Sequence, residues 1–281
     1  MFKPYFPLHL HTTYSIGDGV PLPQEYADVL EKQGFKGGGI ADHGTLSALW
    51  KFQKFLLEKN LKPVLGIEVY VVDEYTKSKE KWHLTLFFKN LNGWLKYLKI
   101  HRKSYTEGFY YKPRVLLSDI LELEDVVVFS GCVYNLFVEK PDYIKQFIDK
   151  FGEDFYLELS VEPSEPRQRL NQFLFEVRKR YPVKFCFTLD AHFINTQDAF
   201  LREVVNCISR GEKLSGSKDL NKYLCILDLQ DIESLTKSYY PYLKGFLNEA
   251  FDSSFEVAEK CQFLLKKLDF REILPSFSEI E

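Results

Sequence analysis

Seven short apolar runs constrain the fold of this chain more than any other feature of its sequence. They cover residues 6–11, 37–42, 64–72, 82–89, 125–132, 155–160 and 183–190. Such runs, nearly continuous in apolar or β-branched residues, are typical of strands that are covered on both faces. Helical patterns over residues 23–33, 46–57, 93–101 and 169–180 separate most of them. We therefore expect an α/β fold, a distorted TIM-like seven-stranded (β/α)7 barrel.

The connection between the third and fourth runs departs from this alternation. Residues 73–81 are too few to carry the helix of a parallel crossover. We predict a hairpin instead, with residues 69–72 antiparallel to residues 83–86. Such a hairpin would return His83 to the rim of the barrel, within reach of Glu68.

The last third of the chain has a different pattern, with helical segments at 196–209, 231–238 and 247–265. The chain has 281 residues, 45% of them hydrophobic, which is enough for one large barrel. We expect residues 1–200 to form the barrel with its metal cluster. Residues 201–267 would be a helical part of the same domain, packed beneath or beside the barrel, and residues 268–281 a linker or junction.

Charge and cysteine content restrict the partners and the compartment. The formal net charge is −3, so bulk positive charge cannot coat nucleic acid, and any nucleic acid must be held locally. The five cysteines are widely spaced without a CxxC pair, and the first residues form neither a signal peptide nor a membrane span. We expect a cytoplasmic protein with reduced thiols and no membrane partner.

Five of the six histidines lie at the ends of the apolar runs or in the turns beside them, together with carboxylates and one cysteine. The candidate metal ligands are His9, His11, Asp18, His43, Glu68, His83, Cys132, Asp190 and His192. Barrel enzymes collect their chemistry at the C-terminal ends of the strands, and these side chains are what divalent metals bind. Nine donors indicate two or three ions. A cysteine among histidines favours Zn²⁺, with Mn²⁺ or Fe²⁺ as alternatives.

A cluster of this charge suits a phosphate. Its acidic ligands supply roughly four negative charges against about six from three divalent ions, and the surplus favours an oxyanion. Candidates for contacts to a phosphate backbone are Lys112 and Arg114, in YKPR, and Arg169. Phe109, Tyr110 and Tyr111 are weaker candidates for stacking on a base, since core packing also explains them.

Other residues of the same types are assigned structural roles. Asp42 is expected to orient its neighbour or the turn, and His101 lies late in a predicted helix, away from the strand ends. The remaining cysteines are expected to be small core residues, namely Cys186, Cys207, Cys225 and Cys261.

The motifs together resemble the PHP (polymerase and histidinol phosphatase) domain. The resemblance rests on HLHTTYSIGDG, IADHGTL, GIEVYV, HLTLFFKNLNGWLKYLKI, GFYYKPRV, VVVFSGC, GEDFYLELS and FTLDAHF, in the family's order over roughly residues 5–275. It is strongest to the N-terminal PHP domain of bacterial C-family DNA polymerase III alpha subunits. The loop after Cys132 departs from that pattern, because it lacks the Gly-Glu that usually follows SGC.

The resemblance implies a cluster of three divalent metals and an assignment of the ligands. One metal would be held by His9, His11, Glu68 and Asp190. Glu68 would bridge to a second metal, held with His83 and Cys132, and the third would be held by Asp18, His43 and His192. A metal-bound hydroxide, held by Glu68, Asp190, His9 and His11, would attack the phosphate.

The implied activity is that of a metal-dependent phosphoesterase, a 3′–5′ exonuclease of the proofreading type acting on single-stranded or frayed 3′ ends of DNA. No palm, fingers or thumb of a polymerase is present, so this chain is not expected to polymerise DNA. Its tail, REILPSF, resembles the junction to a polymerase core, which makes that core and other replisome subunits candidate partners. Two alternatives stay open: a small-molecule phosphomonoesterase of the histidinol-phosphatase type, and a non-catalytic, metal-stabilised scaffold of a replicative polymerase.

Overall fold

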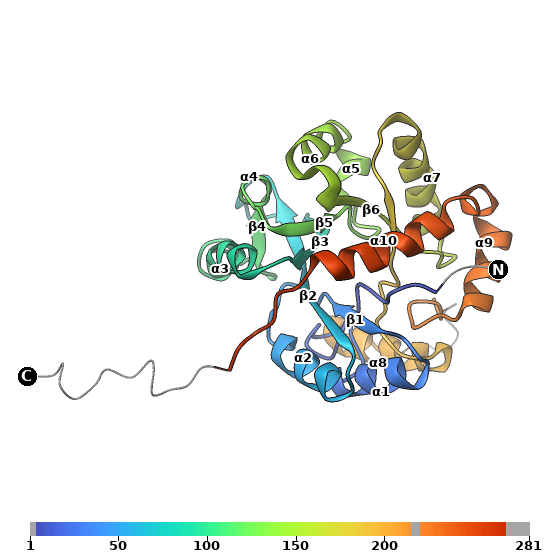
Figure 1. Cartoon of the computed structure of the whole chain (residues 1–281). Helices are drawn as coiled ribbons and strands as arrows, with labels where there is room; N and C mark the ends of the chain where they lie inside the picture. Colours follow the sequence, from blue (N-terminus) through green and yellow to red (C-terminus); the bar gives the residue numbers. More distant parts are fainter. Residues whose placement is uncertain (1–3, 215–219, 268–281) are drawn as a thin grey trace, which may run out of the picture.

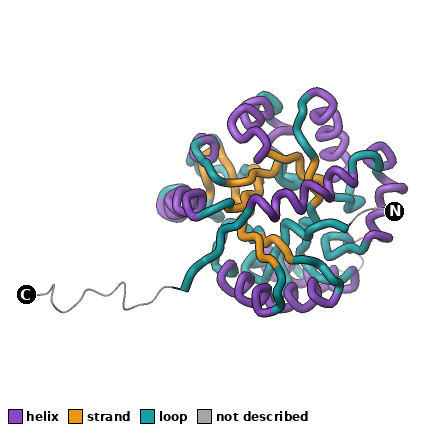
Figure 2. The backbone as a smooth tube through the Cα atoms, in the orientation of Figure 1, coloured by secondary structure: helices purple, strands orange, loops and turns teal. Residues whose placement is uncertain are grey.

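A strongly curled sheet with helices on its outer side organises the chain, which a computed structural model describes over residues 4–214 and 220–267 (Figure 1). Figure 2 shows the strands at the centre and most helices around them. The strands are β1 (Gly37–Ile40), β2 (Lys62–Val72), β3 (Trp82–Phe88), β4 (Arg114–Leu116), β5 (Val126–Phe129), β6 (Phe155–Leu159) and β7 (Phe185–Phe187). Their order is β1-β2-β3-β5-β6-β7, with β4 paired to β2. The expected α/β barrel-like architecture is confirmed.

The hairpin predicted between β2 and β3 is also confirmed. The two strands pair antiparallel, with Val69 opposite Leu84 and Tyr70 opposite His83. β3 and β5 pair antiparallel as well, whereas the pairs β1–β2, β2–β4, β5–β6 and β6–β7 are parallel. Because β3 runs against its neighbours, its first residues lie at the same edge of the sheet as the last residues of the parallel strands.

The strand predicted at residues 6–11 does not form, although the segment lies where the sheet needs a connection between two strands. Leu10 makes single parallel bridges to Ile40 and to Ala191, and no longer ladder forms among the described residues. The backbone at His9 has a φ of +62°, which interrupts an extended strand. The amide of Gly39 donates to the carbonyl of Pro7, and the amide of Ala191 donates to that of His9. The segment therefore lies between β1 and β7 and joins the two edges of the curled sheet.

The helices agree with the periodic segments, and the short ones were not predicted. They are α1 (Pro23–Lys32), α2 (Leu49–Glu58), α3 (Leu91–Thr106), α4 (Leu117–Leu121), α5 (Leu136–Glu139), α6 (Tyr143–Phe151), α7 (Glu165–Arg180), α8 (Ala199–Arg210), α9 (Leu229–Tyr239) and α10 (Leu247–Lys260), with 3-10 turns at Gly152–Asp154, Thr196–Asp198 and Pro241–Leu243. Within the described ranges, no helix combines the length and the apolar character needed to cross a membrane.

The concave side of the sheet is filled in two layers. Its lower layer is apolar and is closed by residues of α10, which lies across the sheet (Figure 1). This layer contains Phe6, Leu8, Ala41, Val64, Phe87, Val127, Phe129, Tyr156 and Cys186, with Val257, Ala258 and Cys261 from the C-terminal helix and the residue that follows it. Side chains on a strand alternate between faces, so Thr85, Glu158 and Thr188, each two residues from a member of this layer, lie on the same face. They form a buried polar layer above it.

Candidate metal centre

The donor groups predicted from the sequence meet at one edge of the sheet. Three sets of side chains have donor atoms within 4.8 Å of one another: His9, His11 and Asp190; His43, Glu68 and His83; and His11, His43 and His192. They come from the segment that joins β1 to β7, from β2, from the start of β3, and from the turns after β1 and β7. Parallel strand ends and the reversed β3 thus bring residues distant in sequence together.

The first set fits a divalent cation. Nε2 of His11 lies 3.4 Å from Oδ1 of Asp190 and 3.8 Å from Oε2 of Glu68, and Nε2 of His9 lies 3.8 and 3.7 Å from the same two carboxylates. Two ligands that each lie about 2.1 Å from one ion are themselves roughly 3–4 Å apart. Both Nε2 atoms are buried and have no hydrogen-bond partner in the structure. Buried, unpaired nitrogens that face carboxylates are the arrangement that a metal ion completes.

Contacts to the other ring nitrogen orient three of the histidines. Nδ1 of His9 contacts the carboxylate of Glu158, Nδ1 of His11 lies 3.0 Å from Oγ of Ser15, and Nδ1 of His192 lies 2.8 Å from the carbonyl oxygen of Asp190. Metal-binding histidines characteristically place one nitrogen on such a partner, which turns the other toward the metal. The three Nε2 atoms accordingly point into the cluster.

Glu68 occupies the centre of the second set. Its Oε1 lies 3.0 Å from Nδ1 of His83, and its Oε2 contacts Nδ1 of His43. The thiol of Cys132 lies 3.3 Å from the same His83 nitrogen, and it is buried and forms no disulfide. Glu68 thus lies between two imidazoles, with a thiol beside one of them, and its role as a bridge between the His9/His11 ion and the His83/Cys132 ion stays a prediction.

Asp18 completes the third set. Its Oδ2 lies 3.1 Å from Nε2 of His43 and 3.0 Å from Nε2 of His192. Its Oδ1 accepts hydrogen bonds from Arg202 of α8, at 2.8 Å from Nε and 2.7 Å from the terminal nitrogen. All nine candidate ligands therefore belong to one connected group, while their division among three ions stays a prediction.

Asp42 supports this group from behind, in the role expected for it. Its buried carboxylate accepts hydrogen bonds from the amide and hydroxyl of Thr12, at 2.7 and 2.8 Å, and from the hydroxyl of Ser15, at 2.6 Å. Ser15 in turn contacts His11. Asp42 thus fixes the loop that orients a ligand instead of facing the cluster itself.

The electrostatics of the cluster favour positive charge at its centre. Burial alone would lower the pKa of His9, but the carboxylates of Glu158 and Asp190 outweigh it and raise the pKa to about 9. Burial would raise the pKa of Glu68, yet the adjacent imidazoles of His83 and His43 hold it well below its usual value. Burial raises the pKa of the Cys132 thiol, and Glu68 raises it further. Carboxylates in this setting require cations, which protonated histidines or metal ions supply.

Three charged residues that contact candidate ligands were missed by the sequence prediction. Besides Arg202, these are Glu158 and Arg167, both fully buried. Arg167, on α7, lies 3.4 Å from Oδ2 of Asp190 and 3.7 Å from Oε1 of Glu162. Glu158 lies inside the apolar run FYLEL, and a carboxylate in such a run indicates a buried charge with a partner. Nothing in the polar helix sequence distinguishes Arg167 from its neighbours.

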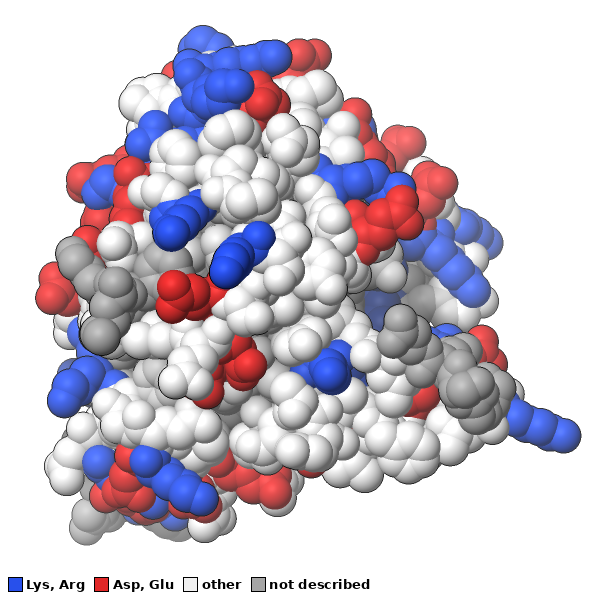
Figure 3. Space-filling model, turned by 90° about the vertical axis from the view of Figure 1, so that its right-hand side faces the viewer, with Lys and Arg blue, Asp and Glu red and all other residues white. Residues whose placement is uncertain are grey.

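A cavity of about 450 Å³ opens above the cluster. Its floor includes Asp18, His43, His83, Cys132, Asp190 and His192, and its walls include Tyr70, Lys81, Lys112, Ser164, Arg202, Asn206 and Asn221. Lys81 is half-buried, and burial together with the cations of Lys112 and Arg114 lowers its pKa. The formal net charge is −3, and Figure 3 shows acidic and basic side chains interspersed on one face of the molecule. Phosphate would therefore be held at the cavity, not by a broad basic surface.

Of the predicted phosphate-binding residues, Lys112 lines this cavity and the other two do not. Arg114 is buried, and its guanidinium donates to the carbonyls of Gly108, Thr76 and Ser78 at 2.9, 2.8 and 3.1 Å. This arginine holds two loops together, so the expectation that it contacts phosphate is not supported. Arg169 lies on the exposed side of α7, paired with Glu165 at 2.8 Å.

The aromatic residues suggested for base stacking also lie away from the cavity walls. Phe109 and Tyr111 are exposed, and the ring of Tyr110 lies 5.4 Å from the guanidinium of Arg114. The exposed aromatic ring at the cavity is Tyr134.

The chain is similar to one protein family and to subunits of bacterial DNA polymerases. The family model described as the PHP domain matches residues 7–161, a range that contains seven of the nine candidate ligands and ends before Asp190 and His192. The chain is 30% identical over 96% of its length to DNA polymerase III subunit alpha of Aquifex aeolicus, and 30% identical over 90% of its length to that of Borreliella burgdorferi. It spans about a quarter of these relatives, 26% and 23% respectively.

One solved structure that matches this chain comes from Bifidobacterium adolescentis, a protein whose metal-dependent phosphoesterase activity is itself a prediction. It is 16% identical, with a TM-score of 0.45, over 83% of this chain and 96% of the other. The extent of the family match, with the similarity to the polymerase subunits along almost the whole length, shows that this chain belongs to the PHP domain family.

Proposed function

We propose that the chain is a metal-dependent phosphoesterase that shortens DNA from its 3′ end. The observation that carries the proposal is the pair of buried, unpartnered Nε2 atoms of His9 and His11, which face Asp190 and Glu68 beneath an open cavity. A structural metal site is normally closed, whereas a catalytic one has access for substrate. The open cavity favours the catalytic reading.

Each side chain has a part in holding or orienting the phosphate. Divalent metals in such a site neutralise phosphate oxygens and lower the pKa of water, so that a nucleophile forms near neutral pH. His9, His11, Glu68 and Asp190 would hold one ion, and Glu158 and Ser15 keep the two imidazoles turned toward it. Lys112, in the cavity wall, is placed to contact a phosphate of the substrate. The thiol among imidazoles supports Zn²⁺, with Mn²⁺ or Fe²⁺ as alternatives.

DNA is proposed as the substrate because of the relatives. They are named as subunits of a DNA polymerase, and this chain is similar to about a quarter of each. A nuclease that removes 3′-terminal nucleotides would complement such a polymerase, and a polymerase core or other replisome subunits are proposed as partners on the same ground. The cavity volume also suits a small phosphomonoester, so this substrate class is the second candidate.

The test is an assay on protein reconstituted with Zn²⁺ or Mn²⁺, with 5′-labelled single-stranded DNA as substrate. We expect stepwise shortening from the 3′ end, reduced at least about 100-fold in a His9→Ala/Asp190→Ala double variant, which loses two ligands of one ion. His101→Ala is the matched control, since this histidine lies on α3 outside the cluster. Intact DNA with p-nitrophenyl phosphate hydrolysed would replace the nuclease with a phosphomonoesterase, and no hydrolysis by metal-loaded protein would leave a scaffold.

A further inference from the structure

Two lysines in the cavity wall lie beside the same aromatic ring. Nζ of Lys81 is 5.4 Å from the ring centroid of Tyr70, and Nζ of Lys112 is 5.7 Å from it. That ring also packs on two candidate ligands, at 5.8 Å from the ring of His43 and 5.0 Å from the ring of His83. Both amines thus line the cavity beside the cluster without being part of it.

Neither amine has a carboxylate within ion-pair distance among the described residues. Other lysines in the same region do, such as Lys103 with Asp119 at 2.9 Å and Lys140 with Asp73. Lys81 is half-buried, so its charge is partly withdrawn from water while a second cation lies on the same ring. Like charges gathered without a counter-ion disfavour each other, and an anion bound between them removes that cost.

The anion is not the phosphate that the ligand cluster would hold. That phosphate would lie on the cavity floor, at Asp18, His43 and Asp190, whereas the two lysines lie in the wall beside the ring of Tyr70, which packs on His43 and His83. A second phosphate, joined to the first by one nucleotide, would reach the wall. A small phosphomonoester has no such group.

We propose that Lys81 and Lys112 bind the uncleaved phosphate next to the scissile one, so that the site selects oligonucleotides over substrates with a single phosphate. The inference rests on the proposed function, because it names the substrate class of that site. Arginine-like forks suit bidentate recognition, whereas two point charges suit a backbone phosphate that is held without regard to base.

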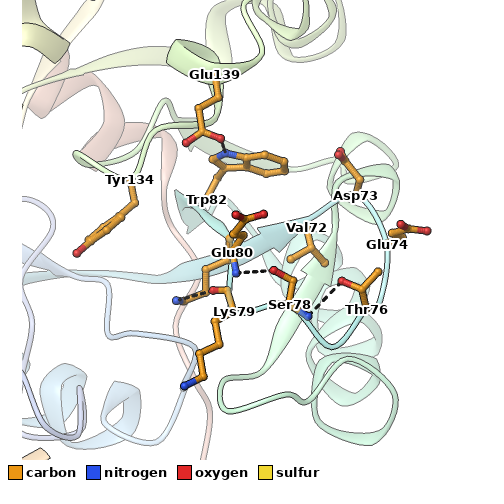
Figure 4. Close-up of a pocket in the computed structure, with 11 residues that line it drawn as sticks. Val72, Asp73, Glu74, Thr76, Ser78, Lys79, Glu80, Trp82, Tyr134 and Glu139 are labelled. Carbon is orange, nitrogen blue, oxygen red and sulfur yellow. Dashed lines mark hydrogen bonds between the residues drawn. The ribbon is translucent and has the colours of Figure 1, made fainter. Parts of the chain in front are cut away.

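The neighbouring cavity limits how far the phosphate chain extends. It shares Lys81 and Tyr134 with the first cavity and has a volume of about 500 Å³. Its walls carry four carboxylates, Asp73, Glu74, Glu80 and Glu139, of which Figure 4 shows Glu139 above Trp82 and Asp73 and Glu74 beside the hairpin loop. Lys140 pairs with Asp73, and the four carboxylates outnumber the two lysines of the lining, Lys79 and Lys81. An acidic wall repels further phosphates, and we therefore assign one additional phosphate and no longer track.

The experiment combines a change in the protein with a change in the substrate. One oligodeoxynucleotide has native linkages throughout, and a second carries a neutral methylphosphonate at the linkage adjacent to the 3′-terminal one. For the wild type, we expect the neutral linkage to raise KM about tenfold, as loss of a charge-assisted phosphate contact would. For a Lys81→Ala/Lys112→Ala double variant, we expect the two substrates to have the same KM within a factor of two.

Two control variants test whether charge is what matters. A Lys81→Arg/Lys112→Arg variant keeps both charges and is expected to keep most of the discrimination. Lys77→Ala removes a lysine of the same hairpin loop that lines neither cavity, and its discrimination should equal that of the wild type. If the alanine double variant discriminates as strongly as the wild type, the second-phosphate site is refuted.

A binding measurement separates this inference from the proposed activity. Fluorescence anisotropy of a labelled oligonucleotide, measured against salt concentration, reports phosphate contacts without hydrolysis. We expect the slope of log K against log salt to decrease by about 0.7 for each lysine removed. A lysine-dependent slope in a protein that hydrolyses nothing would keep the phosphate site and refute the phosphoesterase. Hydrolysis of DNA with no lysine dependence in either assay would keep the phosphoesterase and refute the second-phosphate site.

Discussion

Replacing Glu158 with glutamine is expected to weaken metal binding about tenfold. The carboxylate is fully buried in the polar layer beneath the cluster, where it contacts Nδ1 of His9 and accepts hydrogen bonds from Thr188, at 2.8 Å, and Thr85, at 3.4 Å. Glutamine has nearly the same volume and keeps one acceptor oxygen, so the packing is preserved while the charge is lost.

The magnitude follows from the change in one hydrogen bond. A bond to a charged acceptor contributes about 1.5–3 kcal/mol, against about 0.5–1.5 kcal/mol for a neutral pair. The difference of roughly 1–1.5 kcal/mol corresponds to about a tenfold change in the dissociation constant. This value is at the lower end of the 10- to 100-fold range typical of groups that orient metal ligands.

Competition with a chromophoric chelator measures the affinity of Zn²⁺ for the wild type and the variant at one pH. Glu249→Gln is the matched control, since Glu249 pairs with Arg178 and belongs to none of the three donor sets; it should leave the affinity within twofold of the wild type. Chemical denaturation with chelator present checks that both variants fold. An affinity of the folded Glu158→Gln protein within twofold of the wild type would refute the claim that Glu158 orients His9.

Three further predictions concern stability. Arg114→Met should lower the free energy of unfolding by about 2–4 kcal/mol, because three carbonyls lose their buried donor. Lys112→Ala should change the free energy of unfolding by less than about 0.5 kcal/mol. Equal effects of the two substitutions in urea denaturation would contradict the structural role of Arg114. Burial lowers the pKa of His101 to about 4, so as the pH decreases from 6.5 to 4 the unfolded state takes up a proton before the folded state does. The free energy of unfolding should therefore decrease as the pH is lowered through this window, and it should decrease less in His101→Gln. Parallel pH profiles of the two proteins would refute this. Removal of metal by chelation should lower the Tm of the wild type by more than that of His9→Ala/Asp190→Ala, which has lost two ligands of one ion. Calorimetry measures both shifts, and equal shifts would place the stabilising metal away from these two ligands.

The candidate metal ligands could be predicted from the sequence more completely than the residues that hold them and the neighbouring loops in place. Ligand types at the ends of apolar runs are visible in a sequence because strand ends converge at one edge of a barrel. The hairpin was also predictable, since residues 73–81 are too few for any other connection. His101 could be set aside because it continues a helical pattern instead of ending a strand.

The supports depend on contacts between segments that are distant in sequence. Arg114 is the first residue of β4 and follows a segment of three aromatic residues and a lysine, so its sequence context suggests a free cation, but carbonyls from residues 76, 78 and 108 surround it. Arg167 meets Asp190 only because α7 packs beside β6 and the turn after β7. Neither pairing leaves a pattern along the chain.

The first predicted strand failed for a related reason. An apolar run indicates that residues 6–11 are buried, and they are, yet burial does not determine how the backbone pairs. The positive φ of His9 breaks the ladder and directs this ligand toward Glu158 and the cluster. Strand β4 and helices α4, α5 and α6 have three to nine residues, too few in most cases for a periodic pattern to identify them. The predicted linker at 268–281 lies outside the described residues.

The central claim is that the nine donor groups form one multinuclear metal centre beneath the cavity. Anomalous scattering from a crystal of zinc-loaded protein, recorded on both sides of the zinc absorption edge, tests it most directly. We predict edge-specific peaks within the three donor sets, including one between His9, His11, Glu68 and Asp190. Zinc bound elsewhere in the crystal, with no peak among these side chains, would contradict the account.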